Sequence, residues 1–273
     1  MAGNKPYENF VLENKIEDQF KSHLDLQRFC IVDTSLTGVA GMTKKINVYK
    51  ATDGTEKLAL KAGNTQTIEA SFTGKDYKIL LAQNRGVWYD EEQMTDPMIG
   101  YVIARHAATD MFNTMNKDIF AALGEASLEA TLTGTDYFGA FVDAQALLNV
   151  EAVDAGAPNT FALVSPAVLA KMRKALKDDL KYVESFARSG YVGTVAGTPV
   201  YVKKDAGDDE IKFATREAVT LFLKKGTETE LYQVNNRSAE DANVRKNTLF
   251  TRKYYLAALT DATKAVKITL SGT

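Results

Sequence analysis

The stretch TDPMIGYVIARHAATDMFNTMNKDIFAALG, residues 95–124, decides how the rest of the chain can fold. It opens on Thr95-Asp96-Pro97, in which Asp96 can cap free N–H groups and Pro97 suits the first helical position. It ends on Gly124, and glycine is the usual residue at the end of a helix. We therefore predict a helix of roughly 40 Å, at about 1.5 Å per residue, whose length is typical of an architectural element.

The spacing of side chains assigns two faces to this helix. Apolar and small residues recur at steps of three and four and predict the buried face: Tyr101, Ala104, Ala108, Met111, Met115, Ile119 and Ala122, with Phe112 beside them. Polar residues fill the other face: Arg105, His106, Thr109, Asp110, Asn113, Asn116 and Lys117. We expect the first face to lie on a β-sheet and the second to meet solvent or another chain.

The composition of the 273 residues is that of an ordinary globular chain, with 45% apolar and 25% charged residues. The net charge of −2 gives no global basic character of the kind that sequence-specific nucleic-acid binding needs. A single cysteine, Cys30, excludes an intramolecular disulfide and a multi-cysteine metal site. Because no apolar run approaches ~18 residues and the N-terminus is polar, we expect a soluble protein without a transmembrane helix or a signal peptide.

The N-terminal stretch carries apolar residues at helical spacing among charged ones. These residues are Val11, Leu12, Ile16, Phe20 and Leu24. We expect an arm that packs against something other than the core of its own domain. The alternative is an ordinary first helix of that domain.

Residues 43–82 have the alternation and turn signals of a long β-hairpin. Lysines outnumber acids in it, so the hairpin is locally basic; Lys50, Lys57 and Lys61 lie in its outer half. A two-stranded ribbon is not stable alone, so we expect it to lie on another surface, such as a neighbouring subunit. The alternative is a solvated hairpin that folds back on its own domain.

An acidic segment, Asp90-Glu91-Glu92, directly precedes the long helix. Its carboxylates would favour the positive N-terminal end of a helix. They would also attract the basic hairpin of another chain. The sequence does not separate these two interpretations.

The second half of the chain predicts an α/β region followed by antiparallel strands. A helix at 135–149 and a buried strand at 160–164 lead into a helix from Pro166 to Leu180. The basic face of that helix includes Lys171 and Lys174, and it would be solvated or would contact another subunit. A tight turn is expected at 196–199, and further strands are expected at 218–223, 228–234 (after a turn at Lys225-Gly226), 248–259 and 265–270.

Residues that could carry catalysis are few. Two histidines, His23 and His106, are too few for a triad or a multi-histidine metal site. Glycines in the segment 190–197 are not followed by the Gly-Lys-Ser/Thr of a phosphate loop. Asp205 and Asp208 belong to an acidic stretch that we interpret as a solvated turn. We therefore predict no catalytic residue, cofactor site or metal site.

Three passages carry a resemblance to a known family. They are Tyr77-Lys78-Ile79-Leu80-Leu81 through Trp88-Tyr89-Asp90-Glu91-Glu92, then Phe161-Ala162-Leu163-Val164-Ser165-Pro166, and last Gly190-Tyr191-Val192-Gly193 with Gly197-Thr198-Pro199-Val200. In their order, and in the order of the parts between them, the chain resembles the major capsid protein of tailed bacteriophages, of the Hong Kong ninety-seven type. The resemblance covers nearly the whole chain.

The resemblance implies an α+β fold with an N-terminal arm, an extended hairpin loop, a peripheral domain built on a spine helix, and an α/β axial domain. The implied division is an arm at 1–42, the extended loop at 43–88, the peripheral domain at 89–137, the axial domain at 138–243 and closing peripheral strands at 244–273.

The implied function is that of a structural shell protein rather than an enzyme. Hexamers and pentamers of the chain would tile an icosahedral shell around double-stranded DNA, in a virion assembled in the bacterial cytoplasm. Partners would be other copies, portal and scaffolding proteins and, without specificity, the packaged DNA; no membrane is involved. The charged residues expected at subunit contacts are Lys50, Lys57, Lys61, Asp90, Glu91, Glu92, Lys171 and Lys174. The alternatives are an encapsulin-like compartment, a tail or neck component and a soluble enzyme that uses carboxylates such as Asp205 and Asp208.

Overall fold

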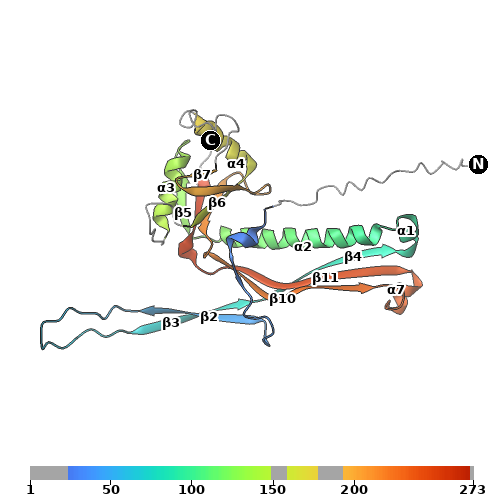
Figure 1. Cartoon of the computed structure of the whole chain (residues 1–273), viewed down its shortest axis with the longest axis horizontal. Helices are drawn as coiled ribbons and strands as arrows, with labels where there is room; N and C mark the ends of the chain where they lie inside the picture. The colour runs from blue at the N-terminus through green and yellow to red at the C-terminus, as the bar shows by residue number, and fades with distance from the viewer. Residues whose placement is uncertain (1–23, 149–158, 178–192, 271–273) are drawn as a thin grey trace, which may run out of the picture.

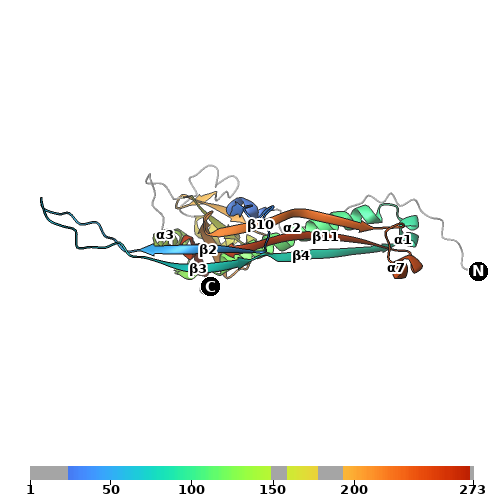
Figure 2. The same cartoon turned by 90° about the horizontal axis from the view of Figure 1, so that it is seen from below.

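The computed structural model describes residues 24–148, 159–177 and 193–270. The molecule is elongated and contains two β-sheets with a projecting hairpin (Figures 1 and 2). The hairpin pairs β2 (Thr43–Ala51) with β3 (Ala70–Lys78) and extends from one end of the molecule. The short helix α1 (Asp90–Thr95) lies at the opposite end.

A four-stranded sheet with the order β1-β10-β11-β4 forms the long part of the body. Helix α2 (Ile99–Gly124) lies along one face of this sheet (Figure 1). The antiparallel pairing of β10 with β11 and of β11 with β4 keeps the long strands together, and β1 adds a short parallel edge. The strands are β1 (Ile31–Asp33), β4 (Leu80–Tyr89), β10 (Val219–Tyr232) and β11 (Lys246–Leu259).

Small residues let α2 approach the sheet closely. A Cβ atom added to Gly86 of β4 would come within 2.2 Å of Cγ2 of Ile103, which leaves no room for a side chain there. A Cβ on Gly100 would meet the buried ring of Trp88 at 3.2 Å. The side-chain amide of Asn84 then donates a hydrogen bond to the carbonyl of Ala107 at 2.8 Å.

The long helix is confirmed, but its start and part of its buried face differ from the prediction. It begins at Ile99 rather than at Pro97, because Asp96 accepts a hydrogen bond from Met98 N in a separate turn. Its buried residues are Ala107, Thr109, Met111, Met115, Asn116, Ile119, Ala122 and Leu123. Three residues predicted to be buried are exposed: Tyr101, Ala104 and Ala108. The spacing predicts Thr109 and Asn116 on the polar face, yet both are buried, because the Thr109 hydroxyl and the Asn116 amide each bond to a backbone carbonyl.

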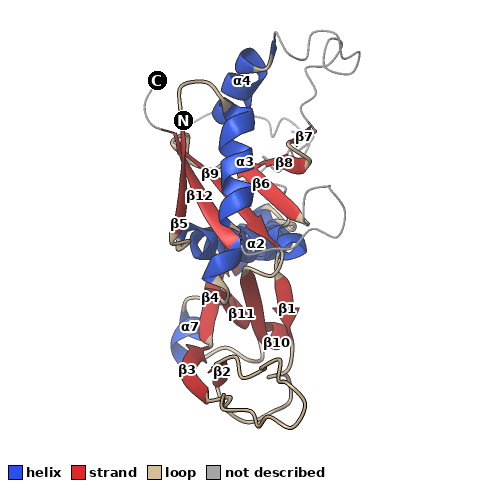
Figure 3. Ribbon diagram, turned by 90° about the vertical axis from the view of Figure 1, so that its left-hand side faces the viewer, coloured by secondary structure: helices blue, strands red, loops and turns tan. Residues whose placement is uncertain are grey.

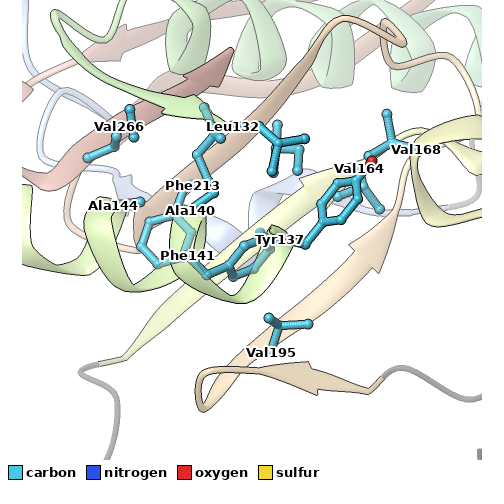
Figure 4. Close-up of a cluster of buried hydrophobic side chains, with 14 of the residues drawn as sticks. Leu132, Tyr137, Ala140, Phe141, Ala144, Val164, Val168, Val195, Phe213 and Val266 are labelled. Carbon is cyan, nitrogen blue, oxygen red and sulfur yellow. The ribbon is translucent and has the colours of Figure 1, made fainter. Parts of the chain in front are cut away.

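The six-stranded sheet has the order β5-β12-β9-β6-β8-β7. Figure 3 shows α3 (Tyr137–Leu147) crossing this sheet, with α4 (Pro166–Ala175) at its far end. Phe141 of α3 packs edge to face on Phe213, with their ring centroids 5.5 Å apart, in the buried cluster that Figure 4 shows. The strands are β5 (Leu128–Leu132), β6 (Thr160–Val164), β7 (Thr194–Val195), β8 (Thr198–Val202), β9 (Glu210–Thr215) and β12 (Ala265–Leu270).

Two of the predicted turns are corrected. No turn separates two strands at Lys225-Gly226, because β10 runs through it against the equally long β11 and absorbs the irregularity as register shifts. The turn predicted at 196–199 is narrower: Ala196 and Gly197 both have positive φ and form it, while Thr198 begins β8.

The sheets cross the predicted domain limits. Strands β5 and β12, at the borders of the predicted peripheral segments, lie in the six-stranded sheet. Strand β10, which falls numerically within the segment 138–243, lies in the four-stranded sheet beside α2. The division of the chain into an arm, an extended loop and two domains stays a prediction. The predicted arm residues 1–23 and the glycine-rich segment 190–192 lie outside the described residues.

Within the described ranges, none of the helices combines the length and the apolar character that crossing a bilayer requires.

Candidate assembly surfaces

Lysines occur along the whole hairpin, and Lys75 near its base contacts the body by donating to the carbonyl of Leu259. Lys50 lies in β2 opposite Ser71 of β3, and Lys57 and Lys61 are exposed in the connection between the strands. The connection is held by its own hydrogen bonds: Glu56 accepts from the N–H and the hydroxyl of Thr65, at 3.0 and 2.9 Å. These bonds lower the pKa of the Glu56 carboxyl. Hydrogen bonds within the hairpin therefore hold its outer connection, although it projects from the body.

Large apolar side chains on the hairpin are also exposed. Leu60 is 99% exposed, Phe72 66% and Ile68 64%. A two-stranded ribbon buries little of its own surface. Exposed apolar side chains of this kind are typical of a surface that another molecule covers.

The acidic segment is largely engaged within its own chain. Asp90 accepts from Nη1 of Arg237 at 3.0 Å, from the second guanidinium nitrogen as well, and from Nδ2 of Asn247 at 2.9 Å. The Arg237 hydrogen bond is the main reason why the pKa of Asp90 lies below its usual value. Glu92 accepts from the N–H of Tyr89 at 2.9 Å and so caps α1. Glu91 meets Arg245 at 3.4 Å, with both side chains mostly exposed.

Sequence reasoning missed Arg237 and Asn247. Arg237 is 147 positions from Asp90 and Asn247 is 157 positions away, so no local pattern links them to the acidic segment. The structure joins them because the start of β11 pairs with the end of β4, next to α1.

Exposed apolar side chains also gather at the α1 end. Met94 is 77% exposed, Tyr101 58% and Met98 46%. Figure 1 places this end and the hairpin at opposite extremes of the molecule. Within one chain the basic hairpin and the acidic segment therefore lie far apart.

The lysines on α4 form a separate surface. Lys171 and Lys174 are exposed and line a hollow of about 450 Å³ together with Tyr137 and Leu270. Helix α4 lies on the six-stranded sheet, away from both the hairpin and α1 (Figures 1 and 3). The eight predicted contact residues thus fall on three surfaces.

The carboxylates considered for catalysis have structural partners. Asp205 forms an ion pair with the buried Lys203. Asp208 accepts from the hydroxyl of Ser165 at 2.5 Å, and this hydroxyl in turn accepts from Val168 N at the start of α4. In the part of the chain that the structure describes, no three His, Cys, Asp or Glu side chains come together in a way that could hold a metal ion.

Solved structures share this fold. The capsid of the cyanophage P-SCSP1u matches with a TM-score of 0.72 and 11% identity, over 93% of this chain and 90% of that one. The mature capsid of bacteriophage PhiM1 matches with a TM-score of 0.66 and 10% identity, over 89% and 86%. A virus-like particle from Pyrococcus furiosus matches with a TM-score of 0.55 and 13% identity, over 90% and 92%.

No protein-family model matches the sequence, and neither does any curated protein. The chain has the fold of tailed-phage capsid proteins, and the predicted α+β class is confirmed. Because the sequence identities are this low, the likeness concerns the fold.

Proposed function

We propose that this chain is a major capsid protein that self-assembles into an icosahedral shell around double-stranded DNA. The observation that carries the proposal is the shared fold over nine-tenths of the chain, with a TM-score of 0.72 to a cyanophage capsid. The separation of the hairpin from the acidic, apolar α1 end supports it, because complementary surfaces at opposite ends favour rings and sheets of copies over isolated molecules.

In this proposal the hairpin of one copy lies across the adjacent copy. Leu60, Ile68 and Phe72 would be covered there, and the lysines of the hairpin would face acidic groups such as Glu91. A single exposed ion pair contributes only about 0.2–1 kcal/mol, so stability of the shell would come from repeating each contact around hexamers and pentamers.

The remaining partners follow from the same proposal. Portal and scaffolding proteins would close and template the shell in the bacterial cytoplasm, and the product would be a virion. The net charge of −2 suits a wall that touches packaged DNA without binding it tightly. We propose no catalytic role, because Asp205 and Asp208 are each occupied by a partner within the chain.

A protein compartment that encloses an enzyme is the second candidate. The observation that favours it is the shared fold with the virus-like particle of Pyrococcus furiosus. The projecting basic hairpin favours the phage capsid instead.

Electron microscopy of the purified protein, combined with sedimentation, tests the proposal. Closed shells or capsomer rings are expected, and analysis of the contents separates DNA from a protein cargo. A monomer that does not assemble, even when a scaffolding protein is co-expressed, would overturn the shell function.

A further inference from the structure

A groove of about 310 Å³ runs between α2 and the long strands of the four-stranded sheet. Ala104 and Ala108 line the side of the groove that α2 forms. Both are exposed, although they continue the apolar stripe of the helix. Leu249 and Thr251 of β11 line the side that the sheet forms. The groove is thus an apolar surface between two rigid elements.

The described chain begins at one end of this groove. Gln27 lines the groove beside Met115, and Leu26 is fully buried in the cluster that contains Met115. The amide of Asn116 fixes the chain at this point through hydrogen bonds with Leu26 N and Leu24 O, both 3.0 Å long. Leu24, the first residue that the structure describes, is therefore held at the mouth of the groove.

The length of the groove matches the apolar part of the N-terminal segment. From Ala104 to Met115 the helix rises roughly 16 Å, at about 1.5 Å per residue. Leu12, Ile16 and Phe20 recur every four residues and continue to Leu24, so one face of a helix over these residues would be apolar for about the same length.

The charges are also complementary. Lys253 is the charged side chain in the lining of the groove, and burial lowers its pKa. The segment 12–23 carries Glu13, Glu17 and Asp18 against Lys15 and Lys21, so its acidic side chains outnumber its lysines. A carboxylate from this segment would stabilise the charged form of Lys253 in a partly buried place.

We propose that residues 12–23 dock as an amphipathic helix into the groove between α2 and β10–β11 of their own chain. The proposal does not depend on the proposed function, because it concerns contacts within one copy. It selects the second of the two alternatives for the N-terminal stretch, a first helix that packs on its own domain.

Cysteine cross-linking tests the proposal. In a Cys30→Ala background, Ile16→Cys and Ala108→Cys are combined and treated with a short bismaleimide. A cross-linked species of monomer mass is expected on a denaturing gel, and a mixture of the two single variants should give no cross-linked dimer. Cross-linked dimers would show that the segment docks on another copy, and the absence of any cross-link would show that the groove is not its site; either result overturns the proposal.

A charge placed in the groove gives a second, independent measurement. Ala108→Glu should raise amide hydrogen exchange of residues 12–23 by about tenfold, because a buried carboxylate destabilises the docked state. Ala121→Glu is the matched control, since Ala121 is an exposed alanine of α2 that lines a different groove. Equal exchange of the segment in the two variants would contradict the proposal, whether or not shells form.

Discussion

Asn116 accepts a hydrogen bond from the backbone N–H of Leu26 at 3.0 Å, although the two residues are 90 positions apart. Both residues are buried, and the same amide donates to the carbonyl of Leu24. Helix α2 therefore anchors the incoming N-terminal chain through one side chain that satisfies two backbone groups. The long helix thus packs on the four-stranded sheet and also binds the backbone at Leu24 and Leu26.

Replacing this amide should destabilise the fold. Asn116→Ala leaves the N–H of Leu26 without its partner in a buried place, which costs about 1–3 kcal/mol. Urea unfolding followed by circular dichroism measures the loss. Lys117→Ala, at the exposed neighbouring position, should change stability by less than about 0.5 kcal/mol. Equal stability of the two variants would mean that the Asn116 bonds do not matter for folding.

A methyl group at Gly86 should separate α2 from the sheet. Gly86→Ala would place its Cβ 2.2 Å from Cγ2 of Ile103, and overpacking of this kind costs about 1–3 kcal/mol. The melting temperature should fall. Ile103→Ala removes the methyl group that the new Cβ would meet. In an Ile103→Ala background, Gly86→Ala should therefore lower the melting temperature by less than it does in the natural sequence. If the double variant is destabilised by the full sum of the two single changes, the close approach of Gly86 to Ile103 is not the cause.

The sequence predicted the elements better than their faces. The long helix, the hairpin and the strand at 160–164 follow from periodicity, turn residues and caps, all of which act within a few positions. The burial of Asn116 does not, because its partners come from a segment far away in the chain. Likewise Lys225-Gly226 is a plausible turn by itself, and only pairing with β11 keeps β10 continuous there.

The candidate surfaces show the same limit. The charges of the hairpin and of the acidic segment could be read from composition, and the exposure of Lys57 and Lys61 agrees with that reading. The bond between Asp90 and Arg237 could not be read from the sequence, because the two residues are 147 positions apart. Asn247, which the pairing of β11 with β4 places opposite Trp88, bonds to both of them.

The ion pair between Asp90 and Arg237 should make stability depend on pH. The pKa of Asp90 is lowered in the folded state, so its contribution is present above the unfolded pKa of about 3.9 and is lost as the pH falls through the folded value. Asp90→Asn should therefore be less stable than the natural sequence near pH 7, and the gap should narrow below about pH 4. Urea titrations at both pH values measure it. A gap that stays constant with pH would assign the loss to something other than the carboxylate.

Shortening the hairpin should separate folding from assembly. Replacing residues 52–69 by Asn-Gly would close β2 on β3 with Ala51 still opposite Ala70, through a two-residue turn of the type that hairpins favour. Nearly all the residues removed are exposed, so the melting temperature should change little while shells are lost. Normal shells under the electron microscope would end the proposed role of the hairpin.

Charge exchange between the hairpin and the α1 end tests which surfaces meet in the shell. Glu91 is the suitable acid, because its carboxylate pairs with the exposed Arg245 at 3.4 Å, whereas Asp90 and Glu92 hold their own chain together. Lys57→Glu with Lys61→Glu should leave the monomer folded and raise the concentration needed for assembly, since like charges would then face each other in every repeat. Adding Glu91→Lys should restore part of the assembly, measured by sedimentation at low salt, and the effect should shrink as salt screens it.

Lys117→Glu on α2 serves as the control for a simple change in net charge. If Glu91→Lys fails to restore assembly while the control assembles normally, the hairpin lysines meet a different surface of the neighbouring copy.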